Sequence, residues 1–360
     1  MDVVNDSGTE GSGSEPAESE YDHSDPAPST DTSAPITSAP LSHLPTAAHT
    51  QAVLRRVVAV LRVMEYLIDS PTEYGKATAP IPHHLSDADR SLLEFASENL
   101  DKYLPFRERA PAVKRARTIV GPYAPTHVRT REGFFSALVF RSILYGAEYM
   151  FDHPFFFQND AKLVNDYATM PFDSNLLKKK YFVDNNIYGA TARDVTPVSR
   201  LWTATAKDIP FNFTNPGPNA PPIPFSAFRD KIRRMKPTRV YPQCGDLTSY
   251  LVTADYVYAD VVMMPTVDEM GALIHDLGKG ALIGLRKMGL VYVHPSIKKF
   301  KPKNKPPVME VVEAFRTFFN FVSSALTSAE QTRMGWDVIM AEHFLCKISR
   351  FHNRRVLKFS

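Results

Sequence analysis

The sequence has little cysteine, no long apolar run, and no basic residue in its first 50 positions. Two cysteines, Cys244 and Cys346, are too few for a disulfide framework or a structural zinc site, so we expect buried thiols in a reducing compartment. No apolar run approaches the roughly 18 residues that a membrane span needs. The opening residues, MDVVNDSG, lack the basic and apolar parts of a secretory signal, which predicts a soluble protein made in the cytosol.

Motifs for catalysis and cofactor binding are also missing, so the sequence predicts no enzyme activity and no cofactor. The segment GKGALIG, residues 278–284, matches neither the phosphate-binding loop nor the dinucleotide-binding pattern, and its glycines indicate bends in a packed segment. His275 and Asp276 form the dipeptide of metal phosphohydrolases, but no H-x-x-x-H or C-x-x-C spacing supports a metal there, at His83–His84 or at His343. An active site that no short motif reveals is the remaining enzymatic alternative.

Charge is divided unevenly along the chain. Residues 1–50 contain nine acidic residues and no Lys or Arg, so the other 310 residues hold all 42 basic and 30 of the 39 acidic residues, a net charge of +12. We predict that residues 1–48, rich in Pro, Ser and Thr, form a disordered acidic arm, because they offer little apolar surface to offset the chain entropy of ordering.

The body, residues 49–360, has helical periodicity and many aromatic residues, which predicts a mainly α fold. An irregular segment, residues 152–225, is predicted between two helical halves, because its aromatic residues lie beside prolines. Thr50 is a candidate cap of the first helix, and Thr266 with Glu269 has the spacing of a capping box. The predicted helices cover residues 50–70, 86–104, 132–151, 225–237, 307–326 and 328–352, with 247–265 ambiguous but favouring a helix.

Four basic clusters lie in this body. A solvated protein surface and contact with a polyanion both explain such clusters, and the pattern carries no signature of sequence-specific reading. We expect non-specific nucleic-acid contact from two of them, which contain Arg229, Lys231, Arg233, Arg234 and Lys236, and Lys298, Lys299, Lys301, Lys303 and Lys305. The other two contain Arg107, Arg109, Lys114, Arg115 and Arg117, and Arg350, Arg354, Arg355 and Lys358.

The layout resembles the capsid proteins of partitiviruses, which are small double-stranded RNA viruses. The stretches that carry the resemblance are PAPSTDTSAPITSAPLSHLP, FNFTNPGPNAPPIPF and GFFSALVFRSILYGAEYMFDHPFFF. The resemblance implies a mostly helical coat protein with shell and protruding portions. It also implies assembly through dimers into an icosahedral shell around RNA, and a location in the virion and the host cytoplasm.

Two aspects of this interpretation have alternatives. The first is an α-helical nucleocapsid protein that coats the single-stranded RNA of a negative-strand virus, with the two basic clusters as walls of an RNA groove. The second concerns the phenylalanines at 155–157 and at 315, 318, 319 and 321, which either form contacts between subunits or fill the core of one subunit.

Overall fold

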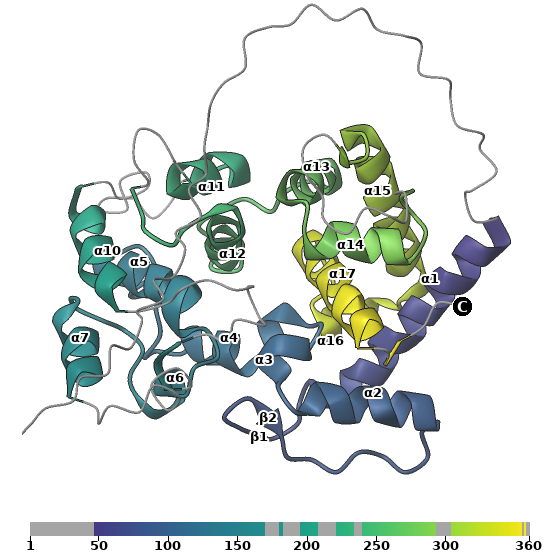
Figure 1. The fold of residues 1–360 in the computed structure, drawn as a ribbon, viewed down its shortest axis with the longest axis horizontal. Helices are drawn as coiled ribbons and strands as arrows, with labels where there is room; N and C mark the ends of the chain where they lie inside the picture. Colours follow the sequence, from purple (N-terminus) through teal and green to yellow (C-terminus); the bar gives the residue numbers. More distant parts are fainter. Residues whose placement is uncertain are drawn as a thin grey trace, which may run out of the picture. The chain divides into compact units, whose positions relative to one another are not determined.

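The computed structural model describes residues 47–169, 180–182, 195–207, 221–233, 240–292, 304–354 and 356–357, and within them the protein is mainly α-helical, as predicted (Figure 1). The elements up to residue 152 are α1 (Ala47–Met64), η2 (Glu65–Leu67), β1 (Thr72–Glu73), β2 (Lys76–Ala77), α2 (Asp87–Ser97), α3 (Leu100–Tyr103), η3 (Arg107–Arg109), α4 (Pro111–Ala116), α5 (Arg131–Val139), η4 (Phe140–Leu144) and α6 (Tyr149–Asp152). The later elements are α7 (Ala161–Ala168), α10 (Thr196–Lys207), α11 (Phe225–Arg233), α12 (Asp246–Val257), α13 (Val267–Leu277), α14 (Gly280–Lys287), α15 (Val308–Ala325), α16 (Ser328–Met334) and α17 (Val338–Asn353).

Helix α1 confirms the predicted first helix but starts earlier than predicted. Ala47 and Ala48 belong to its first turn, so the cap assigned to Thr50 is wrong; alanine is the strongest helix former and extends the helix past that residue. The rest of the predicted acidic arm lies outside the described residues. The apolar side of α1, which includes Val57, Val60 and Leu61, is buried.

The predicted helix over 132–151 is present only in part. Helix α5 continues into η4, a single π-helical stretch, and the backbone then turns before the short helix α6. Every residue from Gly133 to Leu144 is buried, as its nearly continuous apolar pattern predicts. Gly146, with φ +70°, lies in the turn that ends the helix, because few residues other than glycine adopt this left-handed conformation.

The prediction of an irregular segment over 152–225 is partly wrong. Two helices, α7 and α10, lie within it, while residues 170–179, 183–194 and 208–220 are outside the described ranges. Pro197 does not prevent α10 because it occupies the first turn, where no backbone N–H is needed for the helix. Val198 and Leu201 then recur at helical spacing and are fully buried.

Helices α13, α14, α15 and α17 pack together, with α13 beside α15 and α14 beside α17 (Figure 1). The predicted capping box is confirmed: Thr266 Oγ1 accepts a hydrogen bond from Glu269 N, and the Glu269 carboxylate accepts one from Thr266 N. Gly284 allows the close approach of α14 to α17, since a Cβ there would lie 2.3 Å from the carbonyl oxygen of Leu345. The glycines of GKGALIG therefore serve packing, as predicted.

The remaining helix predictions have mixed outcomes. The ambiguous segment 247–265 contains a helix, α12, whose residues Thr248–Val257 are all buried. Helix α15 is confirmed, but the predicted helix over 328–352 is two helices, because the chain turns at Gly335 with φ +65°.

Both phenylalanine clusters belong mainly to the core of the subunit. Phe155 and Phe157 are buried, and Phe156 is half-buried and stacks on His127. Phe315 and Phe318 are fully buried, while Phe319 and Phe321 are half-buried. These rings are therefore largely used inside one chain. None of the helices in the described part of the chain is long and apolar enough to cross a bilayer.

Candidate nucleic-acid interface and buried arginine network

The two basic clusters predicted to contact nucleic acid meet at Asp276, near the end of α13. Arg229 Nη2 lies 2.5 Å and Arg233 Nη1 3.2 Å from Asp276 Oδ2, and Lys305 Nζ donates to the Asp276 carbonyl oxygen at 2.8 Å. We call these four residues the Asp276 junction. Arg233 also forms an ion pair with Asp246 at the start of α12. Clusters about 70 residues apart in sequence are thus neighbours in the fold.

The junction places positive charge around one partly exposed carboxylate. Burial alone would raise the pKa of Asp276, but the hydrogen bond from Arg229 and the charges of Arg233 and Lys305 lower it. The Asp276 side chain is 45% exposed, and that of Arg233 is 33% exposed. Basic groups therefore outnumber acidic ones at this accessible site, which favours binding of a polyanion.

The individual members of the predicted site differ in accessibility. Arg229 is only 8% exposed, so its guanidinium serves the fold more than an external phosphate. Lys231 is half-buried on α11. The other predicted contact residues, Arg234, Lys236, Lys298, Lys299, Lys301 and Lys303, lie outside the described residues, and their role stays a prediction.

The basic residues at 107–117 are used largely for contacts within the fold: Arg107 is buried, Arg109, Arg115 and Arg117 are half-buried, and Lys114 is exposed. Lys114 donates to the carbonyl oxygen of Ile68, and Arg115 donates to the carbonyl oxygens of Met150 and His153. Arg117 forms an ion pair with Glu108. These bonds hold the turns between short helices, where backbone carbonyls have no helical partner.

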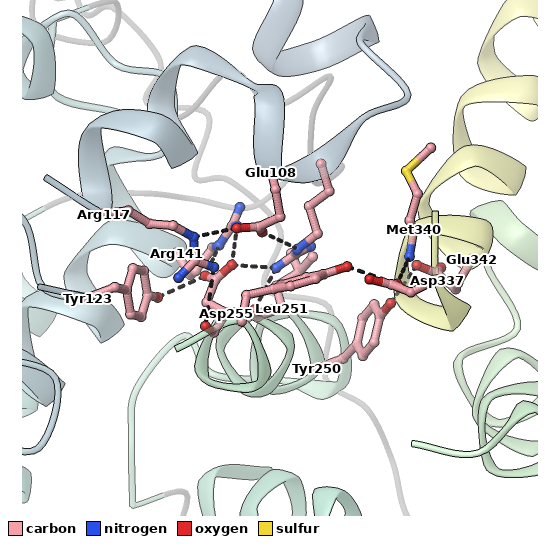
Figure 2. Close-up of polar contacts among 12 residues, drawn as sticks. Glu108, Arg117, Tyr123, Arg141, Tyr250, Leu251, Asp255, Asp337, Met340 and Glu342 are labelled. Atoms are coloured by element: carbon pink, nitrogen blue, oxygen red, sulfur yellow. Dashed lines mark hydrogen bonds and ion pairs between the residues drawn. The ribbon is translucent and has the colours of Figure 1, made fainter. Parts of the chain in front are cut away.

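Asp255, on α12, is the centre of a buried arginine network, which we define as Asp255, Arg107, Arg141 and Tyr123 (Figure 2). Arg141 binds it in a two-pronged manner, with Nε 2.5 Å from Oδ2 and Nη2 2.6 Å from Oδ1. Arg107 Nη2 donates to Oδ1 at 2.7 Å, and Tyr123 donates its hydroxyl hydrogen to Oδ2 at 2.8 Å. The Asp255 side chain is completely buried, and the arginine side chains are 2% exposed.

The positive charges in this network keep the carboxylate of Asp255 ionised. Burial would raise the pKa of Asp255, but Arg141 and Arg107 outweigh it and hold that pKa well below its usual value. Burial and the negative charge of Asp255 raise the pKa of Tyr123 well above its ordinary value, so its hydroxyl remains a donor. The network connects η3, η4 and α12, and it stabilises the packing of these three elements.

No local pattern in the sequence predicts this network. Asp255 is 148 residues from Arg107 and 114 from Arg141, so no local spacing connects them. A signal was present, however: Arg141 and Asp255 each interrupt an apolar stretch, FFSALVFRSILY and VTADYVYA. A charged residue within a buried helix requires a partner of opposite charge.

The C-terminal basic cluster is also used partly within the fold. Lys347 Nζ and Arg350 Nη1 both donate to the carbonyl oxygen of Lys102, at 2.7 and 3.0 Å. Arg354 is exposed, and Arg355 and Lys358 lie outside the described residues.

Among the described residues, the cysteines and histidines form no metal site. Cys244 is buried, as predicted, whereas Cys346 is half-buried, and neither forms a disulfide bond. His343, on α17, is half-buried too. Across the ranges that the structure describes, no group of three or more His, Cys, Asp or Glu side chains could hold a metal ion.

Comparison of the chain with protein-family models, with curated proteins and with solved structures found no match.

Proposed function

We propose that this chain is a structural, non-catalytic protein of a virion that assembles with itself into a closed shell around an RNA genome. The observation that carries the proposal is an exposed apolar surface at the start of α15, which we call the α15 patch: Tyr292, Val308 and Met309. Tyr292 is 45%, Val308 41% and Met309 66% exposed. Tyr292 N donates to Glu310 Oε1 at 3.2 Å, which places that residue beside the first turn of α15.

The α15 patch supports self-association because large apolar side chains gain free energy when a partner removes them from water. The phenylalanine clusters are largely buried within the subunit, so they are less available for this purpose than the α15 patch. A second copy of the chain is the partner that a shell requires, and assembly through dimers uses one self-complementary surface on both copies.

The position of the α15 patch also supports a role with RNA. Lys305, in the Asp276 junction, precedes Val308 by three residues, so the apolar patch lies close in sequence to a half-buried basic residue. A protein that assembles beside a polyanion benefits from this arrangement, because phosphate contacts concentrate subunits on the nucleic acid. The excess of basic over acidic residues after position 50 is consistent with such contacts.

The proximity of the two basic clusters at Asp276 also favours the second candidate, a nucleocapsid protein that coats single-stranded RNA. Both candidates predict RNA contact but differ in the product of assembly. A shell protein forms closed particles of uniform diameter, with or without RNA, whereas a nucleocapsid protein forms filaments or rings that contain RNA in fixed proportion.

The test is the size and nucleic-acid content of the purified full-length protein. Light scattering, the ratio of absorbance at 260 and 280 nm, and negative-stain imaging distinguish the outcomes. Closed uniform particles are expected, and Met309→Glu should reduce their yield strongly because a buried charge opposes the contact. The matched control is Met263→Glu, since Met263 is also about half exposed, at 51%, but precedes α13. A nucleic-acid-free monomer or dimer at all concentrations would overturn both candidates.

A further inference from the structure

A cavity of about 240 Å³ lies among α12, α13, α14, α17 and the segments that carry Arg107 and Arg141. One part of its wall is apolar and includes Leu251, Ile274 and Leu277. His343 and Cys346, on α17, also line the cavity, and both are half-buried.

Positive charge predominates on the polar part of the wall. Five basic residues line the cavity, and we call them the basic wall: Arg107, Arg141, Lys279, Lys347 and Arg350. Arg107 and Arg141 share the single negative charge of Asp255, so one of their two positive charges is left unbalanced.

The two acidic residues on the wall already accept hydrogen bonds from the protein. Asp101 Oδ1 accepts from Ala112 N at 2.8 Å. Glu342 accepts from the Tyr250 hydroxyl at 2.7 Å and from Cys346 Sγ at 3.2 Å. Burial raises the pKa of both acids, that of Asp101 to about 6, which weakens the negative charge that they place on this wall.

Two basic side chains on this wall are incompletely hydrogen-bonded by the protein. Arg107 Nε is buried and has no hydrogen-bond partner, and Glu108 Oε1 lies 3.9 Å from it. Lys347 Nζ donates one hydrogen bond, to Lys102, although an ammonium group has three hydrogens to donate. Burial, with a smaller contribution from the charge of Arg350, lowers the pKa of Lys347 well below its ordinary value, so an anion bound beside it would also favour its charged form.

The first turn of α14 adds to this potential. Lys279 and Gly280 line the cavity, and no side chain caps α14 at Lys279 by a hydrogen bond. The amino end of a helix carries a partial positive charge and backbone N–H groups without helical partners. Gly280 is required here by close packing, since a Cβ would lie 2.7 Å from Cys346 Sγ.

We infer that this cavity binds a small organic anion, such as a phosphate monoester, with its anionic group on the basic wall and its apolar part against Leu251, Ile274 and Leu277. The volume is below the range of about 300–1,000 Å³ that is usual for drug-sized ligands, which favours a small molecule over a nucleic-acid segment. The site is separate from assembly, so a chain that does not form shells can still bind the anion.

The test uses phenyl phosphate, inorganic phosphate and the uncharged benzyl alcohol as probes of the full-length protein, with isothermal titration calorimetry at low ionic strength. Phenyl phosphate should bind most tightly, because it alone satisfies both parts of the wall. Lys279→Ala should weaken it about tenfold, the usual effect of losing a hydrogen bond to a charged group. Lys347→Met should weaken the binding of phenyl phosphate by at least the same factor.

Lys287→Ala is the matched control, because it removes the same charge from the other end of α14, outside the cavity wall. It should leave the affinity unchanged. If Lys347→Met does not fold, Lys279→Ala still decides the question, since Lys279 is exposed. Failure of phenyl phosphate to bind at millimolar concentration, or equal affinity in the wild type and Lys279→Ala, would overturn the inference. Displacement of phenyl phosphate by a short duplex RNA would also overturn it, by assigning the site to nucleic acid.

Discussion

Asp255 and Asp276 each bind two arginines, yet they lie in very different surroundings. Asp255 is fully buried, and Arg107, Arg141 and Tyr123 supply its hydrogen bonds. The Asp276 side chain is 45% exposed, and water shares its solvation with Arg229 and Arg233. In a buried network, loss of one charge leaves the others unpaired in a medium that solvates them poorly, whereas water replaces a lost partner at the surface. We therefore conclude that the first network maintains the fold, while the second leaves its charges available to a ligand.

The largest expected effect is that of Asp255→Asn. This substitution keeps the size of the side chain but leaves two buried arginines without a counter-charge, and it should lower the free energy of unfolding by about 3–5 kcal/mol. Denaturation with urea, followed by circular dichroism, measures the change. A loss below about 1 kcal/mol would mean that water reaches the network and that the contrast with Asp276 is incorrect.

Asp101 extends the comparison to a buried carboxylate without a direct arginine partner. Burial raises its pKa to about 6, above the unfolded value of about 3.9, so the folded state binds the proton more tightly. Its contribution to stability is therefore full below about pH 4 and declines by about 2–3 kcal/mol as the pH rises through 6.

Asp101→Asn should remove this decline, because the amide oxygen still accepts from Ala112 N and the side chain no longer ionises. Melting temperatures between pH 4 and pH 7 provide the measurement. Parallel profiles for the wild type and the variant would show that Asp101 does not titrate in this range. Asp255 should behave in the opposite way, since its lowered pKa makes its stabilisation full above about pH 4 and lost only at lower pH.

Tyr123→Phe tests how much an uncharged hydrogen-bond donor contributes to the stability of the buried network. The variant loses one hydrogen bond to Asp255 but keeps the ring, which Arg117 faces at 5.3 Å from its centroid. Because two arginines still neutralise the carboxylate, we expect a loss of about 1–2 kcal/mol in unfolding free energy. A loss as large as that of Asp255→Asn, measured in the same urea titration, would show that the hydroxyl is as important as the charges.

Asp276→Asn should have the smallest effect on stability, below about 1 kcal/mol, because its ion pairs are partly exposed. It should also strengthen RNA binding at low salt, since the partly exposed Arg233 loses a competing carboxylate. Fluorescence anisotropy with a labelled RNA measures the affinity. Asp268→Asn is the control: Asp268 also pairs with an arginine, Arg316, but lies at the other end of α13. An equal increase for both variants would indicate a general charge effect rather than a site.

The sequence predicted most helices because their signals are local. The capping box at Thr266, the apolar periodicity of α1 and the buried pattern of α5 all lie within single segments. The errors arose where a single residue changed the outcome, as at Gly335, which divides the last helix, and at Pro197, which α10 accommodates in its first turn.

The candidate site was less predictable than the fold because its geometry depends on contacts distant in sequence. The basic clusters were visible as composition, but their meeting at Asp276 depends on how α11 packs near α13. The same composition at residues 107–117 serves internal carbonyls and carboxylates instead. Composition alone does not distinguish these two uses, since burial determines which partner an arginine finds.

Our central claim is that some basic clusters stabilise the fold while others contact a polyanion. The salt dependence of RNA binding by the full-length protein tests this claim most directly. In one variant Lys298, Lys299, Lys301 and Lys303 are replaced by Gln, and in the control Lys76, Lys162, Lys180 and Lys287 are replaced. We predict that the slope of log affinity against log salt falls by about 0.7–0.9 for each lysine of the first set that contacts phosphate. The control should retain nearly the wild-type slope. Equal slopes for the wild type and the first variant would contradict the prediction that these lysines contact a polyanion.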